Sequence, residues 1–214
     1  MLKIQSVYLD GLLEDSRGDD SLSKSLKVKN LNYIFSCKNI LVTGKKREDC
    51  NSLPNATNLE FVNLNAPTQG ALATSLLSID YLEEDMPIVL VPTNSFVDRE
   101  ILIKFLNKAI DTKVSASTIC IETDDPNYSY LRVHNNKVIE FVEKRIAGKF
   151  GTTGIFYLQN KRIFLESAQW ALINSQQTNG VFYVAPALNY VISMGLEVSY
   201  EVILENQYTH IEWN

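Results

Sequence analysis

Residues 87–122, PIVLVPTNSFVDREILIKFLNKAIDTKVSASTICIE, contain the pattern that decides the fold. Residues 88–92 form a continuous apolar run, which is typical of a strand covered on both faces. Residues 99–110 then carry apolar side chains at helical spacing, with Asp98 in the position of an N-cap, and residues 114–122 form another strand-like run. A strand, a helix and a second strand in this order favour a largely parallel sheet.

The same alternation extends in both directions along the chain. Two short alternating runs, residues 129–133 and 137–142, are joined by Asn135-Asn136 and predict a tight hairpin. The remaining predicted elements are strands over residues 2–9, 39–43, 59–64, 153–159 and 197–204, and helices over residues 69–82, 161–175 and 183–194. We therefore expect one α/β domain over residues 1–214, with a Rossmann-like, mixed but mainly parallel sheet flanked by helices and an added antiparallel hairpin. Ligands of such folds bind at the carboxyl ends of the strands.

Composition excludes several classes of function. The net charge is −5 and no basic stripe is present, so nucleic acid is not an expected partner. No window holds the roughly 18 apolar residues of a membrane span, so no membrane contact is expected. The three cysteines are few and irregularly spaced, which indicates a reducing compartment and a cytoplasmic location. Neither histidine lies near a cysteine at metal-ligand spacing, so a structural zinc site is not expected.

Four segments carry residues suited to ligand binding. Thr68-Gln69-Gly70-Ala71 opens a helix, where backbone N–H groups approach a ligand closely. Residues 87–98 place Asn94 directly after the buried strand. Glu143-Lys144 and Thr152-Thr153-Gly154 follow the hairpin. Residues 179–190, NGVFYVAPALNY, are the most specific string in the chain.

In this order the segments resemble sugar-phosphate nucleotidylyltransferases, the nucleoside-diphosphate-sugar pyrophosphorylases, and most of all their capsule and surface-polysaccharide branch. The resemblance covers residues 60–210, and residues 1–45 more weakly. It implies a GT-A-like fold that binds a nucleotide and a sugar phosphate. The residues that it implies for the nucleotide are Gly11, Gln69, Gly70 and Asn94. Those that it implies for the sugar phosphate are Glu143, Lys144, Thr153, Gly154, Asn179 and Tyr183.

The amino-terminal segment departs from the family pattern of a glycine-rich loop followed by an arginine and a lysine. Gly11 matches the first glycine, but Leu13 and Asp15 stand at the second glycine and the arginine, and Lys24 takes the place of the catalytic lysine. The same stretch carries several acidic residues: Asp10, Glu14, Asp15, Asp19 and Asp20. Acidic side chains repel a triphosphate, so this segment predicts a degenerate catalytic loop.

The two metal-binding carboxylates of the family are also replaced. Asn94 stands at the first position, where an amide oxygen ligates Mg²⁺ without contributing charge. His210 stands at the second and is a weak ligand for Mg²⁺. We expect Mg²⁺ only if the protein is active, in which case Asp98 or Glu212 would have to supply a carboxylate.

Three hypotheses remain open from the sequence. The first is a catalytically impaired family member that binds a sugar phosphate or nucleotide sugar, as a homo-oligomer or together with an active paralogue. The second is a working nucleotidylyltransferase with an atypical triphosphate and metal site, which forms a nucleotide sugar and pyrophosphate. The third is a structural interaction module without a polar ligand site.

Overall fold

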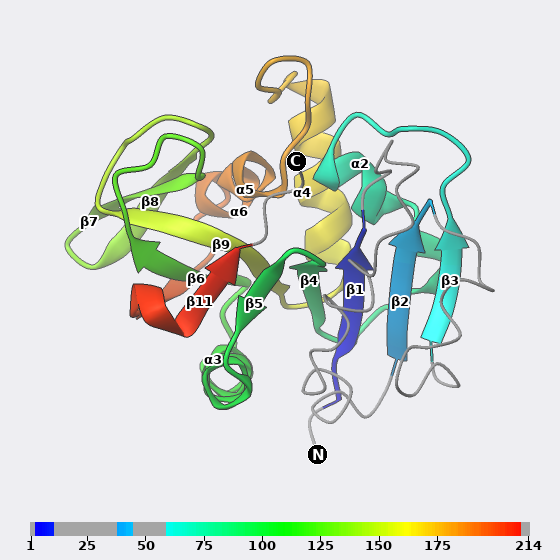
Figure 1. Cartoon of the computed structure of the whole chain (residues 1–214), viewed down its shortest axis with the longest axis horizontal. Helices are drawn as coiled ribbons and strands as arrows, with labels where there is room; N and C mark the ends of the chain where they lie inside the picture. The colour runs from blue at the N-terminus through cyan, green and yellow to red at the C-terminus, as the bar shows by residue number, and fades with distance from the viewer. Residues whose placement is uncertain (1–2, 11–37, 45–58, 211–214) are drawn as a thin grey trace.

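A nine-stranded sheet forms the centre of the protein (Figure 1). The computed structural model describes residues 3–10, 38–44 and 59–210. The main path of the sheet runs in the order β10, β6, β9, β4, β1, β2 and β3. Its strands are β1 Gln5–Leu9, β2 Lys38–Thr43, β3 Leu59–Asn63, β4 Ile88–Pro92, β6 Ala116–Glu122, β9 Phe150–Leu158 and β10 Val198–Ile203. The hairpin strands β7 Tyr130–His134 and β8 Lys137–Val142 join this sheet through β9.

The direction of the strands confirms the predicted mixed, mainly parallel sheet. β1 pairs in parallel with both β2 and β4, β2 pairs in parallel with β3, and β10 pairs in parallel with β6. β9 lies between β4 and β6 and is antiparallel to both. The strand–helix–strand unit of residues 87–122 therefore brings β4 and β6 into the same sheet with one antiparallel strand between them.

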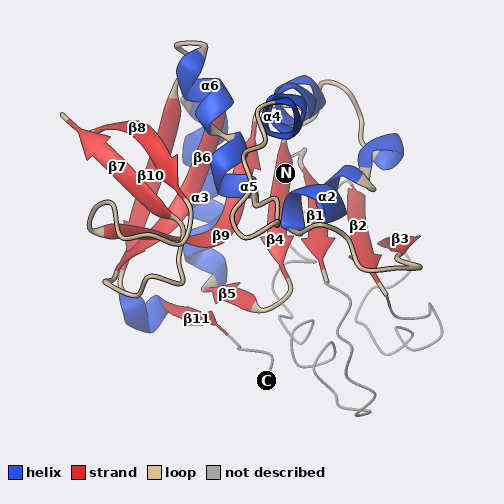
Figure 2. Ribbon diagram, turned by 90° about the horizontal axis from the view of Figure 1, so that it is seen from above, coloured by secondary structure: helices blue, strands red, loops and turns tan. Residues whose placement is uncertain are grey.

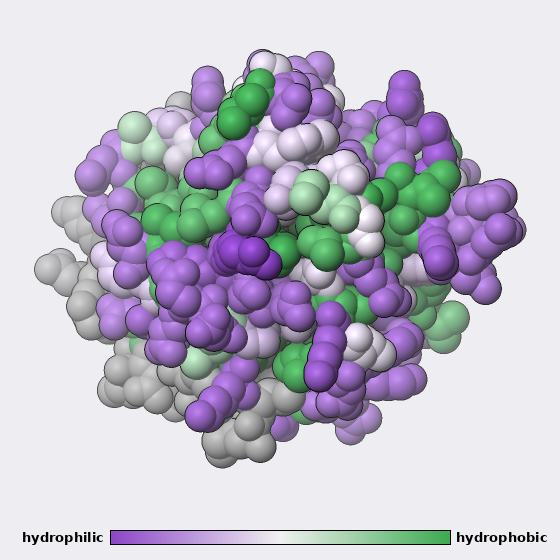
Figure 3. Space-filling view, turned by 180° about the vertical axis from the view of Figure 1, so that it is seen from behind, coloured by the Kyte–Doolittle hydropathy of each residue, from purple (hydrophilic) through white to green (hydrophobic). Residues whose placement is uncertain are grey.

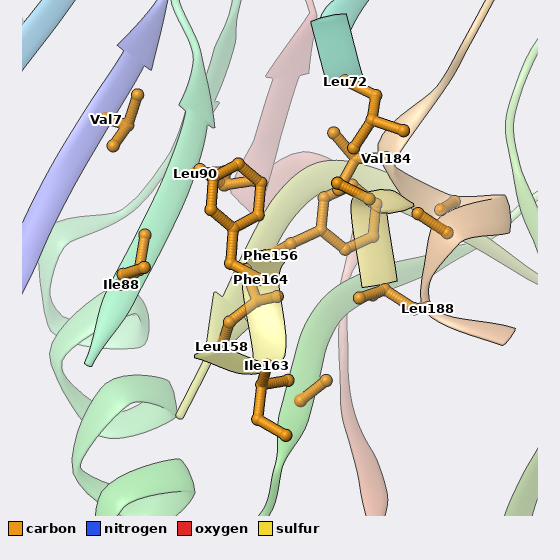
Figure 4. Packing of buried hydrophobic residues seen from close by; sticks show 14 of the residues in the cluster. Val7, Leu72, Ile88, Leu90, Phe156, Leu158, Ile163, Phe164, Val184 and Leu188 are labelled. Atoms are coloured by element: carbon orange, nitrogen blue, oxygen red, sulfur yellow. The ribbon is translucent and has the colours of Figure 1, made fainter. Parts of the chain in front are cut away.

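Helices cover both faces of the sheet (Figure 2). α2 Ala71–Leu76, α4 Lys161–Ile173, α5 Val184–Ala187 and α6 Asn189–Ser193 pack on one face, and α3 Arg99–Asp111 packs on the other. On the first face, Leu72, Phe164 and Val184 meet β4 and β9 in one buried cluster (Figure 4). On the second face, Phe105 and Leu106 of α3 belong to a second buried cluster that includes Tyr157 of β9. The two clusters explain why the central strands are apolar on both sides.

The turn between β7 and β8 confirms the predicted hairpin. Asn135 and Asn136 have φ angles of 48° and 60°. Two consecutive residues with positive φ are the signature of the type I′ turn, whose twist matches that of paired strands. Asparagine adopts this conformation more readily than most residues.

Two predicted helices are wrong in length. Residues 69–82 form only the short α2 and the 3₁₀ turn η4 Ile79–Tyr81. The hydroxyl groups of Ser75 and Ser78 donate to backbone carbonyls one turn back, which competes with helix propagation. Residues 183–194 form α5 and α6 instead of one helix, because the Asn189 amide bonds both the N–H and the carbonyl of Phe141 in β8.

A second, two-stranded sheet was not predicted. β5 Ser95–Val97 pairs antiparallel with β11 Tyr208–His210, which follows the 3₁₀ turn η5 Glu205–Gln207. Each strand has three residues, too few to give a readable alternation. This small sheet brings the end of the described chain back beside the carboxyl end of β4.

Seen from behind, hydrophilic side chains separate small apolar patches (Figure 3). No helix in the described part of the chain has the length and apolar character needed to span a bilayer.

Candidate functional site

A buried carboxylate lies at the carboxyl end of the central strand β1. Asp10, which is 2% exposed, directly follows β1. The Thr43 hydroxyl donates to its Oδ2 at 2.6 Å, and the Thr93 hydroxyl donates to its Oδ1 at 3.1 Å. Thr43 ends β2 and Thr93 follows β4, so residues from three neighbouring strands meet at one carboxyl group. The sequence placed Asp10 among the acidic residues of a loop and did not predict these two partners.

The start of α2 is joined to the segment that carries the most specific sequence motif. The Gln69 carbonyl accepts from the Phe182 N–H at 2.7 Å, and the Phe182 carbonyl accepts from the Leu72 N–H at 3.1 Å. Gly70 lies between these two bonds with a φ of 107°. A Cβ at this position would lie 2.4 Å from the Phe182 oxygen, so only glycine permits the close approach. Packing therefore accounts for Gly70, and its predicted contact with a nucleotide stays a prediction.

The Asn-Gly pair of the same motif forms a tight turn. Thr178 and Val181 exchange two backbone hydrogen bonds of 3.0 Å around Asn179 and Gly180. Both central residues have positive φ, 53° and 78°. The tight turn explains why asparagine and glycine stand at positions 179 and 180, and it leads the chain to Phe182 and Tyr183. The exposed side chain of Asn179 remains a predicted sugar contact.

The predicted sugar-phosphate residues Glu143, Lys144 and Tyr183 lie together. Lys144 follows β8, and its Nζ lies 5.0 Å from the centre of the Tyr183 ring, in the geometry of a cation–π contact. Glu143 is half-buried beside it and accepts a hydrogen bond from the hydroxyl of Ser129. Tyr183, from a distant segment of the chain, thus lies beside Lys144, whose sequence neighbour Glu143 supplies a carboxylate.

Burial controls the protonation of this carboxylate. Desolvation raises the pKa of Glu143 above its ordinary value, while the Ser129 hydrogen bond and the charge of Lys144 act in the opposite direction.

Burial raises the pKa of Tyr208 to about 12, with the Ser95 hydrogen bond offsetting part of that effect. The Tyr208 hydroxyl is 3.3 Å from Ser95 Oγ and 3.4 Å from the Thr153 carbonyl. Tyr208 therefore remains protonated at neutral pH.

The two predicted metal positions lie on neighbouring segments. Asn94 forms the two-residue turn between β4 and β5 with Thr93, and His210 pairs with Ser95, the next residue along the chain. Tyr208 lies between β5 and the aromatic residue Tyr128, with a centroid separation of 6.4 Å in an edge-to-face arrangement. The small sheet thus places His210 opposite Ser95, the residue that follows Asn94, and the predicted role of both positions in metal binding stays a prediction.

The donor set at this edge does not fit a Mg²⁺ ion. Mg²⁺ prefers charged oxygen ligands in near-octahedral geometry, whereas Asn94 is neutral and His210 offers a nitrogen. The nearby Asp10 carboxylate already accepts from two threonine hydroxyls. Within residues 3–10, 38–44 and 59–210, no group of three or more His, Cys, Asp or Glu side chains could hold a metal ion.

The last two predicted residues belong to strand β9. The Thr153 hydroxyl is buried and donates to the Ile119 carbonyl at 3.1 Å. Gly154 has a φ of 82°, and a Cβ there would lie 2.9 Å from the Pro92 ring. Both residues thus have a structural role in fastening β9 to its neighbours, and their predicted sugar contacts stay predictions. The predicted residues Gly11 and Lys24 lie outside the described part of the chain.

Neither a protein-family model nor a curated protein matches the sequence, but solved structures share its fold. A nucleoside-diphosphate-sugar pyrophosphorylase from Vibrio cholerae is 17% identical, with a TM-score of 0.77 over 96% of this chain and 94% of that chain. A putative glucose-1-phosphate thymidylyltransferase from Bacillus anthracis, solved with sucrose, is 17% identical. Its TM-score is 0.66, with 94% of this chain and 87% of that chain covered.

A third similar structure is a mannose-6-phosphate isomerase from Helicobacter pylori. It is 20% identical, with a TM-score of 0.62 over 80% of this chain and 76% of that chain. At sequence identities of 17–20%, the likeness to these structures shows a shared fold and nothing further. The fold is the nucleotidyltransferase-like α/β fold that the sequence predicted.

Proposed function

We propose that this chain is a cytoplasmic, nucleotidyltransferase-like protein of sugar-nucleotide metabolism that binds a sugar phosphate or nucleotide sugar and is catalytically impaired. We place it with the surface-polysaccharide branch because of the motifs in residues 124–154 and 179–190. The observation that carries the proposal is the meeting of Glu143, Lys144 and Tyr183 beside the start of α2.

The chemistry of these three side chains supports a phosphorylated sugar as the ligand. The Glu143 carboxylate accepts hydroxyl donors, and Lys144 supplies a compact counter-charge for a phosphate. The Tyr183 ring adds an apolar surface with the polar groups at its edge. Such an arrangement matches the resemblance in the sequence, and it disfavours a purely structural module, which would lack convergent polar groups.

Charge at the amino-terminal side supports catalytic impairment. Asp10 places an acidic side chain at the carboxyl end of β1, where it accepts a hydrogen bond from Thr93, the residue before Asn94. A triphosphate approaching this end meets repulsion that a glycine-rich loop would not exert. The position of Asp98 argues against it as the substitute metal carboxylate, because it lies beyond β5, four residues after Asn94. At about 3.3 Å per residue, that is roughly 13 Å along an extended chain.

Thermal shift with glucose 1-phosphate, mannose 1-phosphate and their nucleotide sugars tests the binding. A ligand present at about 100 times its Kd stabilises by about 2.7 kcal/mol, which raises the Tm of a domain of this size by several degrees. Lys144→Gln is expected to weaken binding at least tenfold, since a charged hydrogen bond contributes about 1.5–3 kcal/mol. Lys113→Gln is the matched control, because both lysines are exposed with positive φ, 47° for Lys144 and 55° for Lys113.

A second assay separates this proposal from the active alternative, which would need Glu212 or another carboxylate at the metal site. The protein is mixed with a nucleoside triphosphate, Mg²⁺ and the same sugar 1-phosphates, and pyrophosphate is measured. Sustained release of pyrophosphate would overturn catalytic impairment. The absence of any thermal shift, or equal loss of binding in the Lys113 control, would overturn the ligand site.

A further inference from the structure

Asn189 joins the start of α6 to the outer edge of β8. In the described sheet β8 pairs only with β7, so its other edge has no neighbouring strand. The Asn189 Oδ1 accepts from the Phe141 N–H at 2.8 Å, and the Asn189 Nδ2 donates to the Phe141 carbonyl at 3.0 Å. The side-chain amide thus pairs with Phe141 as a residue of a neighbouring strand would. We call these two hydrogen bonds the Asn189 clamp.

The Asn189 clamp connects the two segments that carry Lys144 and Tyr183. Lys144 lies three residues after Phe141, just beyond the end of β8, and Tyr183 lies six residues before Asn189, at the start of α5. Both α5 and α6 lie against β8, and residues 184–188 between Tyr183 and Asn189 are buried. Only a few residues therefore separate the clamp from each of the two side chains.

The Asn189 clamp fixes a register that apolar packing alone would leave open. Apolar contacts are not directional, whereas a donor and an acceptor on the same amide must both meet their partners. In a regular strand, backbone groups that point to the same edge recur every second residue, about 7 Å apart. A slip of α6 by one such step would separate the Lys144 Nζ from the Tyr183 ring, whose centre lies 5.0 Å away.

We propose that Asn189 is a positioning residue of the sugar-phosphate site, because it sets the register at which the Lys144 ammonium lies over the Tyr183 ring. An ammonium has three N–H donors, and one aromatic face occupies only part of that capacity, so donors remain for a phosphate. Placing the ammonium before the ligand arrives reduces the rotamer freedom that binding would otherwise remove. This inference rests on the proposed sugar-phosphate site and adds a residue that acts on it through Lys144.

NMR of the ligand-free protein tests the positioning directly. Protons above an aromatic ring resonate upfield, so the methylene group next to the Lys144 Nζ is expected upfield of those of the other lysines, and its loss in Lys144→Gln assigns it. Asn189→Ala is expected to remove most of this upfield shift. Leu102→Val is the control, because it weakens the buried cluster on the opposite face of the sheet and should leave the shift unchanged. An unchanged shift in Asn189→Ala would overturn the positioning role.

Calorimetric titration with glucose 1-phosphate and mannose 1-phosphate connects this position with binding. Asn189→Ala is expected to weaken binding about three- to tenfold, and by no more than Lys144→Gln does, since its effect passes through that lysine. In the Lys144→Gln background, Asn189→Ala should cause less than about a twofold further loss. Losses that add in the double variant, or an equal loss in Leu102→Val, would overturn the inference while the sugar site stands.

The two proposals fail in different ways. If the wild type binds no sugar phosphate but Asn189→Ala still removes the Lys144 shift, the proposed function and the role of Asn189 in binding are both overturned, while its control of Lys144 stands. If Asn189→Ala does not fold, Asn189→Ser, which keeps part of the polar contact on a shorter side chain, is expected to reduce the shift in the same direction. An unchanged Lys144 signal in a folded serine variant would again contradict the positioning role.

Discussion

Gly70→Ala tests the joint between α2 and the segment that carries Tyr183. Gly70 has φ 107° and ψ 178°, a region of backbone conformation open almost only to glycine. An added methyl group would lie 2.4 Å from the Phe182 oxygen, 2.5 Å from Val181 Cγ1 and 3.0 Å from the Phe182 nitrogen. Two of these three atoms belong to the backbone, so a rotamer change cannot relieve the overlap.

The expected loss has two parts. Backbone strain in this region costs about 1–3 kcal/mol, and overpacking costs about 1–3 kcal/mol more. We expect Gly70→Ala to lower the free energy of unfolding by about 2–6 kcal/mol, a large share of the 5–15 kcal/mol typical of a domain. Gly195→Ala is the matched control, because its φ is also positive, 69°, but no atom lies within 4 Å of an added Cβ. Its cost should be near the 1–2 kcal/mol of a left-handed alanine.

Urea unfolding followed by tryptophan fluorescence measures both variants, with Trp170 in α4 reporting on the adjacent core. Two-state unfolding gives the free energy of unfolding as the product of the urea midpoint and the slope m. The slope m should stay constant across the variants, because each substitution changes stability without changing the surface exposed on unfolding. Equal losses in Gly70→Ala and Gly195→Ala would refute the close approach of Gly70 to Phe182. Because Phe182 precedes Tyr183, the variant should also weaken binding of sugar phosphates, which the Gly195 control should leave unchanged.

Three other predictions concern charges and their partners. Burial raises the pKa of Glu143 in the folded state, so the folded protein holds that proton more tightly and loses stability as the pH rises from the ordinary carboxyl range through the raised pKa. Glu143→Gln should lack this decrease in unfolding free energy between acidic and neutral pH, and an unchanged pH profile would contradict the burial of this carboxylate. Asn94→Asp with His210→Asp should create Mg²⁺ affinity measurable by calorimetry, because the β5–β11 register pairs His210 with Ser95, the residue after Asn94. Thr209→Asp with Asn94→Asp is the control, since neighbouring residues of a strand point to opposite faces. Asp10→Ala should cost about 2–4 kcal/mol in urea unfolding by leaving two threonine hydroxyls without this acceptor, and a loss below about 1 kcal/mol would refute the buried contacts.

Patterns among neighbouring residues were sufficient to predict much of the secondary structure. The apolar run of β4, the helical spacing of α3 and the Asn135-Asn136 turn each depend on consecutive residues, and the structure confirms all three. The candidate site could be predicted as a set of residues, because the motifs that carry the family resemblance can be read without coordinates. The lengths of α2 and of α5–α6 could not, since hydroxyl groups and the Asn189 amide divert the backbone through specific contacts.

The sequence by itself determined the class of fold and the kinds of side chain at the site. Only the tertiary structure decided which of them meet: Ser95 with Tyr208, 113 residues apart, Asp10 with Thr93, 83 residues apart, and Ser129 with Glu143 across a hairpin. The physical reason is the separation along the chain over which each effect acts. Periodicity and turn preference act between residues a few positions apart, whereas strand register and the position of β9 between β4 and β6 depend on how distant segments bury their apolar faces together.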